Sequence, residues 1–362
     1  MHKQSLFHIS KRDALPWYQR VLIRGGAILL ALIVCALVTM LLTGENPISI
    51  YGTIFYGAFG TARKSWVTFQ NLAVLLGISL AVTPAFKMRF WNIGAEGQVL
   101  IGCLATAACM ICLGDKLPSG LLILVMLAAA LAAGALWGFL PSFFKAKWNT
   151  NETLFTLMMN YVAANVVSYF LVVWVPSGSS SLGKLPFGRL PSVVHDYFLI
   201  IVVAFVLTIA TFVYLNYSKH GYEISVVGTS VRTAQYSGMN VKKIIIRTMI
   251  VSGLLCGLTG YLIAAGLDQS ITTESVGGQG FTAIMVSWLA HFNPLSMLLT
   301  SGLITLLNQG AAQISQDFNV SGAFPDVIVG IILFFIIGSE FFINYKVKLR
   351  RRARAVRKED IK

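Results

Sequence analysis

The chain has 362 residues, of which 56% are hydrophobic and only 12% are charged. One soluble core cannot bury that much apolar surface, so a water-soluble globular fold is excluded and lipid is expected to surround most of the chain. The net charge of +14 lies at the chain ends and between apolar runs, without the interleaved aromatics of a single-strand binder, so we predict no nucleic-acid partner.

Ten apolar runs divide the chain, and most have the length of about 17 to 25 residues that crosses a hydrocarbon core as a helix. This pattern predicts an all-α polytopic membrane protein with about ten transmembrane helices. The runs lie at 25–43, 67–86, 93–113, 120–144, 153–175, 197–217, 244–266, 281–291, 295–312 and 323–343. The eighth is too short to span unaided, so we expect either a tilted helix between polar turns or a broken helix that lines a cavity.

Basic residues flank the first and the last run. Those before the first run are Lys3, Lys11, Arg12, Arg20 and Arg24, and a dense basic cluster at 346–362 follows the last. Since cytoplasmic segments carry the excess of Lys and Arg, both termini are predicted to face the cytoplasm. The predicted divisions are an amino-terminal cytoplasmic segment at 1–24, a transmembrane domain at 25–343 and a basic cytoplasmic tail at 344–362. The tail also suits contact with anionic membrane lipid.

Two patterns that look like known sites are interpreted as structural. The five cysteines fall inside apolar runs, so even Cys109 and Cys112, with CxxC spacing, are expected to pack in the bundle. Residues 178–184 copy the GxxxxGK spacing of a phosphate loop, but Leu185 replaces the Ser or Thr that must meet magnesium, and Pro186 follows. We predict no cofactor, no metal site and no catalytic residue.

The central stretches of all ten runs lack Asp, Glu, Lys and Arg. A carrier driven by protons or sodium usually needs ionisable groups there, because its site must change charge or coordination as the ion moves. Their absence favours a transporter whose power source lies in another protein. Because backbone carbonyls can bind sodium, the alternative of an ion-coupled secondary transporter or a channel that acts without an ATPase stays open.

The longest connection on the predicted cytoplasmic side spans 218–243. Its middle predicts a short amphipathic helix that Ser230 caps and Gly238 ends, with apolar contacts from Ala234 and Tyr236. A short capped helix suits docking into a groove on a soluble partner, although an ordinary surface connector has the same composition.

A polar segment opens the third run, where Asn92, Glu96 and Gln98 lie around two glycines. Polar groups at membrane depth need partners, and glycines allow a helix to break, so the segment suits a translocation path. The alternative is a helix cap at the membrane interface, with Asn92 as the cap and Glu96 in the first turn.

Amides also mark the fifth run. Asn151 and Glu152 are predicted as its cap and first turn, whereas Asn160 and Asn165 lie inside the helix, where an amide needs a partner. For Asn160, lining of a pore and a helix–helix hydrogen bond are equally compatible with the sequence.

A second glycine-rich break, at 277–281, opens the eighth run, five spans after the break at 92–98. Because five is odd, the two breaks would point toward the middle from opposite faces. This predicts two inverted five-helix repeats, after or including a peripheral first helix. Glycines at GxxxG spacing, 134/138 and 253/257, predict tight helix contacts.

Several of these stretches resemble one family of membrane proteins. WNIGAEGQ at 91–98 resembles the FNIGxEGQ signature, with Trp for Phe, and NETLFTLMMNY at 151–161 is similar to NEVxxTLMLNY. The likeness runs from about residue 70 to 340. These motifs resemble the inner-membrane permeases of ABC importers of the branched-chain amino acid, ribose and nucleoside type, within their nucleoside and simple-sugar subgroup.

The loop at 228–238 is similar to the coupling segment of the same permeases, a pattern like G-x-N-x-x-A-A-x-x-x-G-I before an apolar helix rich in small residues. The family's Asn and one Ala are absent, and Ser230 and Thr233 stand near those places. The contacts of this loop with an ATPase would therefore differ from those of the family's usual coupling segment.

The resemblance implies a multi-pass permease of the cell (inner) membrane that translocates nucleosides, or simple sugars, by alternating access driven by a separate ATPase, with no enzyme activity of its own. The implied partners are a cytoplasmic ABC ATPase on 218–243, a second permease subunit in a heterodimer, and an extracytoplasmic substrate-binding lipoprotein. The substrate-path candidates are Asn92, Glu96, Gln98, Asn160, Gln279 and Phe281. The ATPase-coupling candidates are Gly228, Arg232, Ala234 and Gly238.

Overall fold

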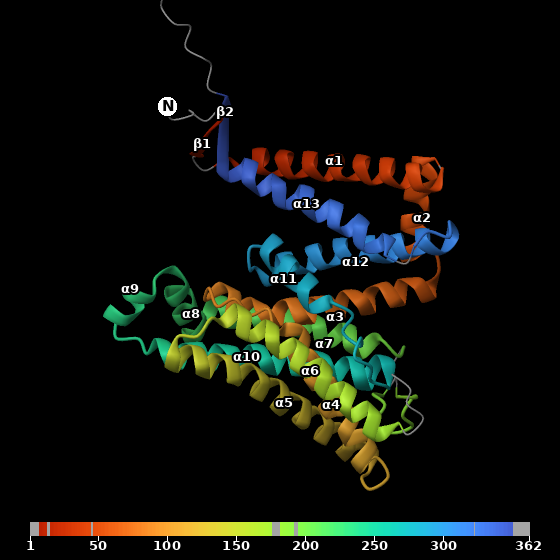
Figure 1. Ribbon diagram of the computed structural model, residues 1–362, viewed down its shortest axis with the longest axis vertical. Coiled ribbons are helices and arrows are strands. Elements are labelled where there is room, and N and C mark those ends of the chain that lie inside the picture. Colours follow the sequence, from red (N-terminus) through yellow and green to blue (C-terminus); the bar gives the residue numbers. More distant parts are fainter. Residues whose placement is uncertain are drawn as a thin grey trace, which may run out of the picture. The chain divides into compact units, whose positions relative to one another are not determined.

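The computed structural model describes residues 7–12, 15–44, 46–175, 182–191, 195–321 and 323–349. The described chain is helical apart from two short strands and its connections, so the predicted all-α membrane class is confirmed (Figure 1). The predictions for Lys3, for most of the phosphate-loop spacing at 178–184 and for most of the basic tail lie outside the described residues.

Among the described residues, nine helices are long and apolar enough to cross a membrane. They are α1 (Trp17–Thr43), α3 (Ala62–Lys87), α4 (Ala95–Leu113), α5 (Ser119–Trp148), α6 (Glu152–Trp174), α7 (Phe198–Tyr217), α10 (Val241–Tyr261) with its π-helical extension η1 (Leu262–Asp268), α12 (Pro294–Asp317) and α13 (Phe324–Asn344). Each corresponds to one predicted run, with edges that shift by up to eight residues.

The eighth predicted run is a short helix, α11 (Gln279–Leu289), of 11 residues. Its length is about 16 Å at 1.5 Å per residue, well short of a hydrocarbon core of about 30 Å, so α11 is a broken element that cannot span the membrane alone. Three further short helices are α2 (Pro47–Phe59), α8 (Lys219–Thr229) and α9 (Val231–Tyr236). The sequence analysis did not foresee α2 or α8, because neither has the length of a span.

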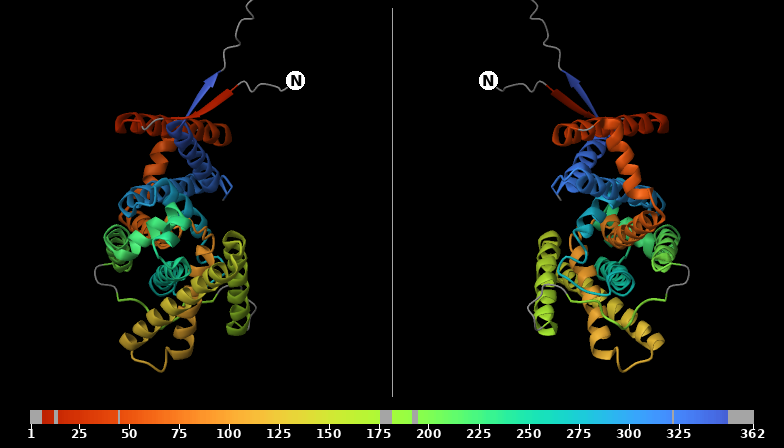
Figure 2. Two further views of the ribbon diagram at one scale, coloured as in Figure 1. Left: turned by 90° about the vertical axis from the view of Figure 1, so that its left-hand side faces the viewer. Right: turned by 90° about the vertical axis from the view of Figure 1, so that its right-hand side faces the viewer.

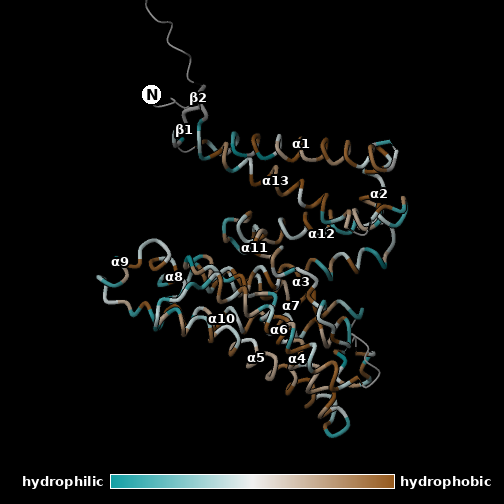
Figure 3. The backbone as a smooth tube through the Cα atoms, in the orientation of Figure 1, coloured by the Kyte–Doolittle hydropathy of each residue, from teal (hydrophilic) through white to brown (hydrophobic). Residues whose placement is uncertain are grey.

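The described chain divides into two compact units. The terminal unit holds residues up to 57 and from 307 onward, and the central unit holds 58–306. Figure 3 shows hydrophobic residues along the long helices, whereas hydrophilic residues are frequent in the connections and around α8 and α9. This distribution is that of helices that face lipid and connections that face water.

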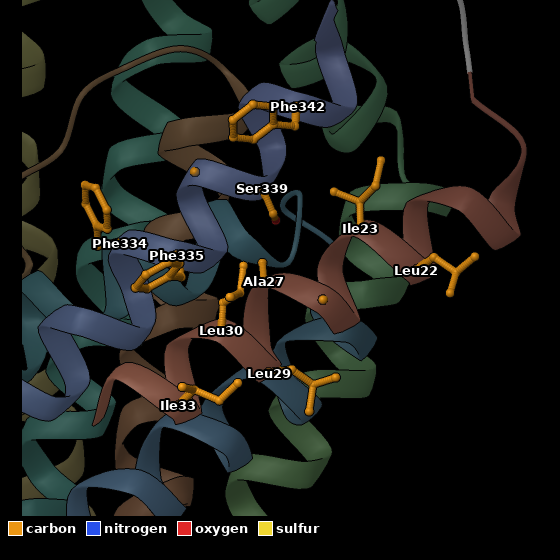
Figure 4. Close-up of a pocket in the computed structure, with 12 residues that line it drawn as sticks. Leu22, Ile23, Ala27, Leu29, Leu30, Ile33, Phe334, Phe335, Ser339 and Phe342 are labelled. Atoms are coloured by element: carbon orange, nitrogen blue, oxygen red, sulfur yellow. The ribbon is translucent and has the colours of Figure 1, made fainter. Parts of the chain in front are cut away.

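In the terminal unit, α1 packs along α13, and Arg24 forms an ion pair of 2.6 Å with Glu340. Strand β1 (Phe7–Lys11) pairs antiparallel with β2 (Tyr345–Leu349), so the first and last described segments lie side by side. A groove of about 720 Å³ between α1 and α13 is lined almost wholly by apolar side chains, among them Leu30 and Phe335 (Figure 4). Such a groove suits lipid chains.

In the central unit, α10 packs against α3, α4 and α5. Its Gly253 and Gly257 face Gly134 and Gly138 of α5 so closely that a Cβ on Gly253 would collide with the carbonyl oxygen of Gly134. Both predicted GxxxG pairs therefore meet each other, as expected for close helix packing in a membrane. Figure 2 shows α5 returning beside α4 after the short connection between them.

The cysteines follow the prediction in part. Cys35, Cys103 and Cys256 are buried, but Cys109 is only half-buried and Cys112, near the end of α4, is exposed. Packing in the bundle therefore describes four of the five, because Cys109 lies against the apolar cluster that includes Met110, whereas Cys112 is exposed.

Candidate functional site

The connection between α3 and α4 enters the central bundle. Asn92 donates to Oγ of Ser252, which lies eleven residues into α10, and Asn160, eight residues into α6, accepts from the backbone of Gly97. At 1.5 Å per residue these partners lie about 17 Å and 12 Å along their helices. Irregular backbone at such depth occurs only where protein or a water-filled cavity surrounds it.

Asn92 and Gln98 form one buried amide network. Nδ2 of Asn92 donates to Oε1 of Gln98 at 3.3 Å and to Ser252, and Oδ1 of Asn92 accepts from Nε2 of Gln98 and from the backbone of Gly94. Both side chains are buried. Gly94, and not Asn92, holds the cap position of α4, so the alternative of an Asn92 cap is wrong, whereas Glu96 does lie in the first turn. The network fixes the shape of the break.

Asn160 joins α6 to the same break. Its Oδ1 accepts from the backbone of Gly97 at 2.9 Å, and its Nδ2 donates to the carbonyl of Ile93 at 2.9 Å. Thr156, one turn earlier, accepts from the backbone of Ile93 at 3.1 Å. Two roles were left open for Asn160. The structure shows the helix–helix hydrogen bond, which joins α6 to Gly97 of α4. By contrast, Asn165 is exposed and bonds to its own helix.

Glu96 connects the two glycine-rich breaks. One carboxylate oxygen accepts from the backbone of Gly278 at 2.8 Å and the other from Gly280 at 2.7 Å. Gly278 has φ +75° and holds the cap position of α11, so the carboxylate sits at the positive end of that helix. The two breaks thus meet, as the repeat prediction expects, whereas the inverted symmetry of the two halves stays a prediction.

The two candidates on α11 differ in their surroundings. Oε1 of Gln279 is buried and has no hydrogen-bond partner among the described residues, whereas Phe281 is 42% exposed. Residues two positions apart on a helix point about 200° away from each other, so these side chains serve different faces of α11.

The coupling loop has the predicted short helix. Oγ of Ser230 accepts from the backbone of Thr233 at 3.2 Å and caps α9, and Gly238 follows its end with φ +76°. Both predicted helix signals are therefore confirmed. Asn151 likewise caps α6, as predicted, and Glu152 in the first turn of α6 pairs with Lys145 at 2.8 Å.

The four coupling candidates separate into buried and exposed residues. Ala234 is fully buried among apolar residues of the bundle, and Gly228 packs against the carbonyl of Lys87 at the end of α3. Arg232 and Gly238 are exposed. Tyr236, which the sequence analysis counted only as an apolar contact, is 92% exposed and is the most prominent side chain of α9.

Helix α8 attaches this loop to the bundle. Glu223 forms an ion pair of 2.6 Å with Arg247 of α10, and His220 lies 3.7 Å from the same carboxylate. The hydrogen bond from Arg247 lowers the pKa of Glu223 below its ordinary value. The partners Ser252 and Arg247 could not have been found from sequence, because neither belongs to a recognisable motif.

Comparison with known proteins places these features in a family. Residues 63–337 match the family described as "Branched-chain amino acid transport system / permease component". The chain is 30% identical over 322 residues to the Guanosine ABC transporter permease protein NupP of Bacillus subtilis, a match that covers 86% of this chain and 92% of the relative.

Two further relatives cover similar shares. The Glucose ABC transporter permease protein TsgB13 of Haloferax volcanii is 27% identical over 86% of this chain and 85% of the relative. The Nucleoside ABC transporter permease protein NupB of Lactococcus lactis is 27% identical over 88% of this chain and 91% of the relative. The chain therefore belongs to the branched-chain amino acid transport system permease family and is a multi-pass membrane subunit of a transport system.

Proposed function

We propose that the chain is the permease subunit of an ABC importer and carries nucleosides across the cell membrane by alternating access. The observation that carries this proposal is α9, a capped helix that buries Ala234 and exposes its other face, beside α8, which packs against α3 and α10. The nucleoside substrate is supported by two relatives whose names specify guanosine and nucleosides. A relative named for glucose makes simple sugars the second candidate.

The ATPase would dock on α9. Arg232 and Tyr236 are exposed there, and a cavity of about 580 Å³ between α9 and the end of α5 is lined by Asn149, Gln235 and Lys242, among others. Motion imposed on α9 would reach α10 through the Glu223–Arg247 ion pair and α3 through Gly228. ATP binding and hydrolysis by the partner would thereby shift the bundle between two states.

The solute path would lie between this chain and a second permease subunit. Inside the central unit, Asn92, Gln98 and Asn160 are buried and paired with one another or with backbone, and α5 and α10 touch through glycines. That packing leaves the path on a face of the chain, where a partner is needed to close it. A second, different permease would complete the heterodimer.

Both termini would face the cytoplasm, which requires an even number of crossings, so α11 together with the irregular segment before it would complete the crossing between η1 and α12. The pairing of β1 with β2 brings the ends of α1 and α13 together, which supports a common side for both. An extracytoplasmic binding lipoprotein would then deliver the solute to the side opposite α9.

The substrate is tested by uptake of labelled guanosine, uridine and glucose in cells with and without this gene. Loss of guanosine and uridine uptake is expected, with glucose uptake unchanged. If nucleoside uptake is unchanged and glucose uptake is lost, the assigned substrate changes from nucleosides to simple sugars. Transport by the purified chain in vesicles without an ATPase would favour the ion-coupled carrier or channel.

The docking role of α9 is tested by co-purification of the ATPase. Arg232→Glu reverses an exposed charge, and Gly238→Pro forbids the positive φ at the helix end, so both are expected to reduce the bound ATPase about tenfold. Asn216→Ala, exposed at the end of α7 and bonded to its own helix, is the matched control. Recovery of the ATPase at unchanged yield from both variants would contradict docking at α9.

A further inference from the structure

The face of α11 that this chain leaves uncovered is aromatic. Phe281, Met285 and Trp288 are 42%, 43% and 49% exposed and recur at the spacing of one helix face. The opposite face is buried through Ala283, Val286 and Ser287.

Trp91 extends this face from the neighbouring break. Its ring lies 5.3 Å from that of Trp288, centroid to centroid, and it is 44% exposed. Beneath the pair, the ring of Phe86 lies 5.9 Å from Trp91 and 6.4 Å from Phe292, and Phe292 lies 6.3 Å from Trp288. The rings of Trp91 and Trp288 are therefore held in place by the packed rings of Phe86 and Phe292.

Lipid is not the expected neighbour of this face. Helix α11 is bounded by irregular backbone, with positive φ at Gly277, Gly278, His291 and Phe292. Its first turn is held by Glu96 beside the buried break, and Ser287 near its end shares a hydrogen bond of 2.7 Å with Thr83 inside α3. Irregular backbone that faces hydrocarbon would leave polar groups unpaired, so water or protein must cover this side.

We propose that Phe281, Met285, Trp288 and Trp91 form an aromatic wall of the solute path that stacks on the planar ring of a nucleoside base. Exposed tryptophan rings that are held rigidly bind flat heterocycles by stacking. They tolerate different nucleobases, because each nucleobase has a π face. This inference rests on the proposed function and adds to it the residues that select solutes carrying a planar ring.

Thiol labelling tests whether the wall faces water. In a background with Cys109→Ser and Cys112→Ser, Met285→Cys in membranes is treated with a water-soluble maleimide, with and without guanosine; Phe281→Cys is the second position. The matched control is Phe205→Cys on the unbroken helix α7, where the side chain is 55% exposed. We expect the maleimide to label both α11 cysteines and guanosine to slow that labelling severalfold. The cysteine of Phe205→Cys should stay unlabelled.

Uptake by the complete transporter tests stacking. Trp288→Ala and Trp91→Ala should each raise the KM for guanosine about tenfold, the effect of losing one base–aromatic stack, whereas Trp288→Phe and Trp91→Phe should stay near the parent value. Phe205→Ala should leave KM unchanged.

The outcomes separate this inference from the proposed function. Absent labelling on α11, labelling that guanosine does not slow, or equal KM values for the Ala and Phe variants would overturn the aromatic wall while guanosine uptake still depends on the gene. If deletion of the gene leaves all nucleoside uptake intact, the proposed substrate fails first and the wall fails with it.

Discussion

In the break at 92–98 the side chains of Asn92, Glu96 and Gln98 are all hydrogen-bonded inside the bundle, whereas in α9 Arg232 and Tyr236 are exposed. Both segments are short and polar, with glycines inside the break and on either side of α9. The difference lies in their surroundings, since a polar group at membrane depth must first be satisfied by protein, while a group at the aqueous surface remains available to a partner. The buried amides Asn92, Gln98 and Asn160 thus surround the place where the backbone leaves the helix.

The largest expected effect tests the packing that surrounds the break. Gly253→Leu puts a side chain against the carbonyl of Gly134, where helix backbones touch, so we expect destabilisation by at least about 3 kcal/mol or loss of the folded bundle. Thermal unfolding in detergent measures it. Gly120→Leu, where a Cβ meets nothing within 4 Å, is the control and should unfold near the parent temperature.

Next in size is the connection between the two breaks. Glu96→Ala leaves the backbone N–H groups of Gly278 and Gly280 without their acceptor and should cost about 2 to 3 kcal/mol, with a larger loss of transport than of assembled complex. Thermal unfolding and guanosine uptake are measured on the same variant. Full transport by Glu96→Ala would show that the position of α11 does not matter to the path.

A smaller loss of stability is expected from Asn160, a single amide that is hydrogen-bonded to the break at 92–98. Asn160→Ala removes the partners of Gly97 and Ile93 and should destabilise the protein by about 1 to 3 kcal/mol. Asn165→Ala, on the same helix but exposed and bonded only to its own turn, should change stability by less than about 0.5 kcal/mol. Equal unfolding temperatures for the two variants would remove the contrast between buried and exposed amides.

The smallest effect concerns the coupling loop. Because Arg247 lowers the pKa of Glu223, this pair contributes stability that is present above the unfolded-state pKa of about 4.3 and is lost as pH falls through the lower folded-state value. The difference in unfolding temperature between the parent and Glu223→Gln should therefore be constant near pH 7 and vanish in acid. A difference that persists below both pKa values would assign it to packing.

The sequence was most informative where a single physical rule decides the outcome. Apolar length located nine spans, the Ser230 and Gly238 signals located α9, and the glycine spacings of α5 and α10 predicted tight helix contacts, although not that these two helices meet each other. Periodicity and capping act within one segment, so they can be read directly from the chain.

What sequence could not supply is the pairing of distant groups. Asn92 appeared as a cap or a path residue, but its partner Ser252 lies 160 residues away on α10. Ala234 and Tyr236 appeared equivalent within α9, yet one is buried against the bundle and the other is exposed. The aromatic face of α11 was missed except for Phe281, because Trp91 and Trp288 become neighbours only in the folded chain.

The hydrogen bonds of Glu96 also carry a consequence for biosynthesis. Their donors lie 182 and 184 residues further along the chain, so the carboxylate enters the membrane long before Gly278 and Gly280 are synthesised. Until then it must keep a proton, retain water or borrow another donor, since an unpaired carboxylate is costly in hydrocarbon. Insertion of this protein therefore cannot be completed helix by helix in the order of translation, because the carboxylate of Glu96 gains its two backbone donors only when α11 is in place.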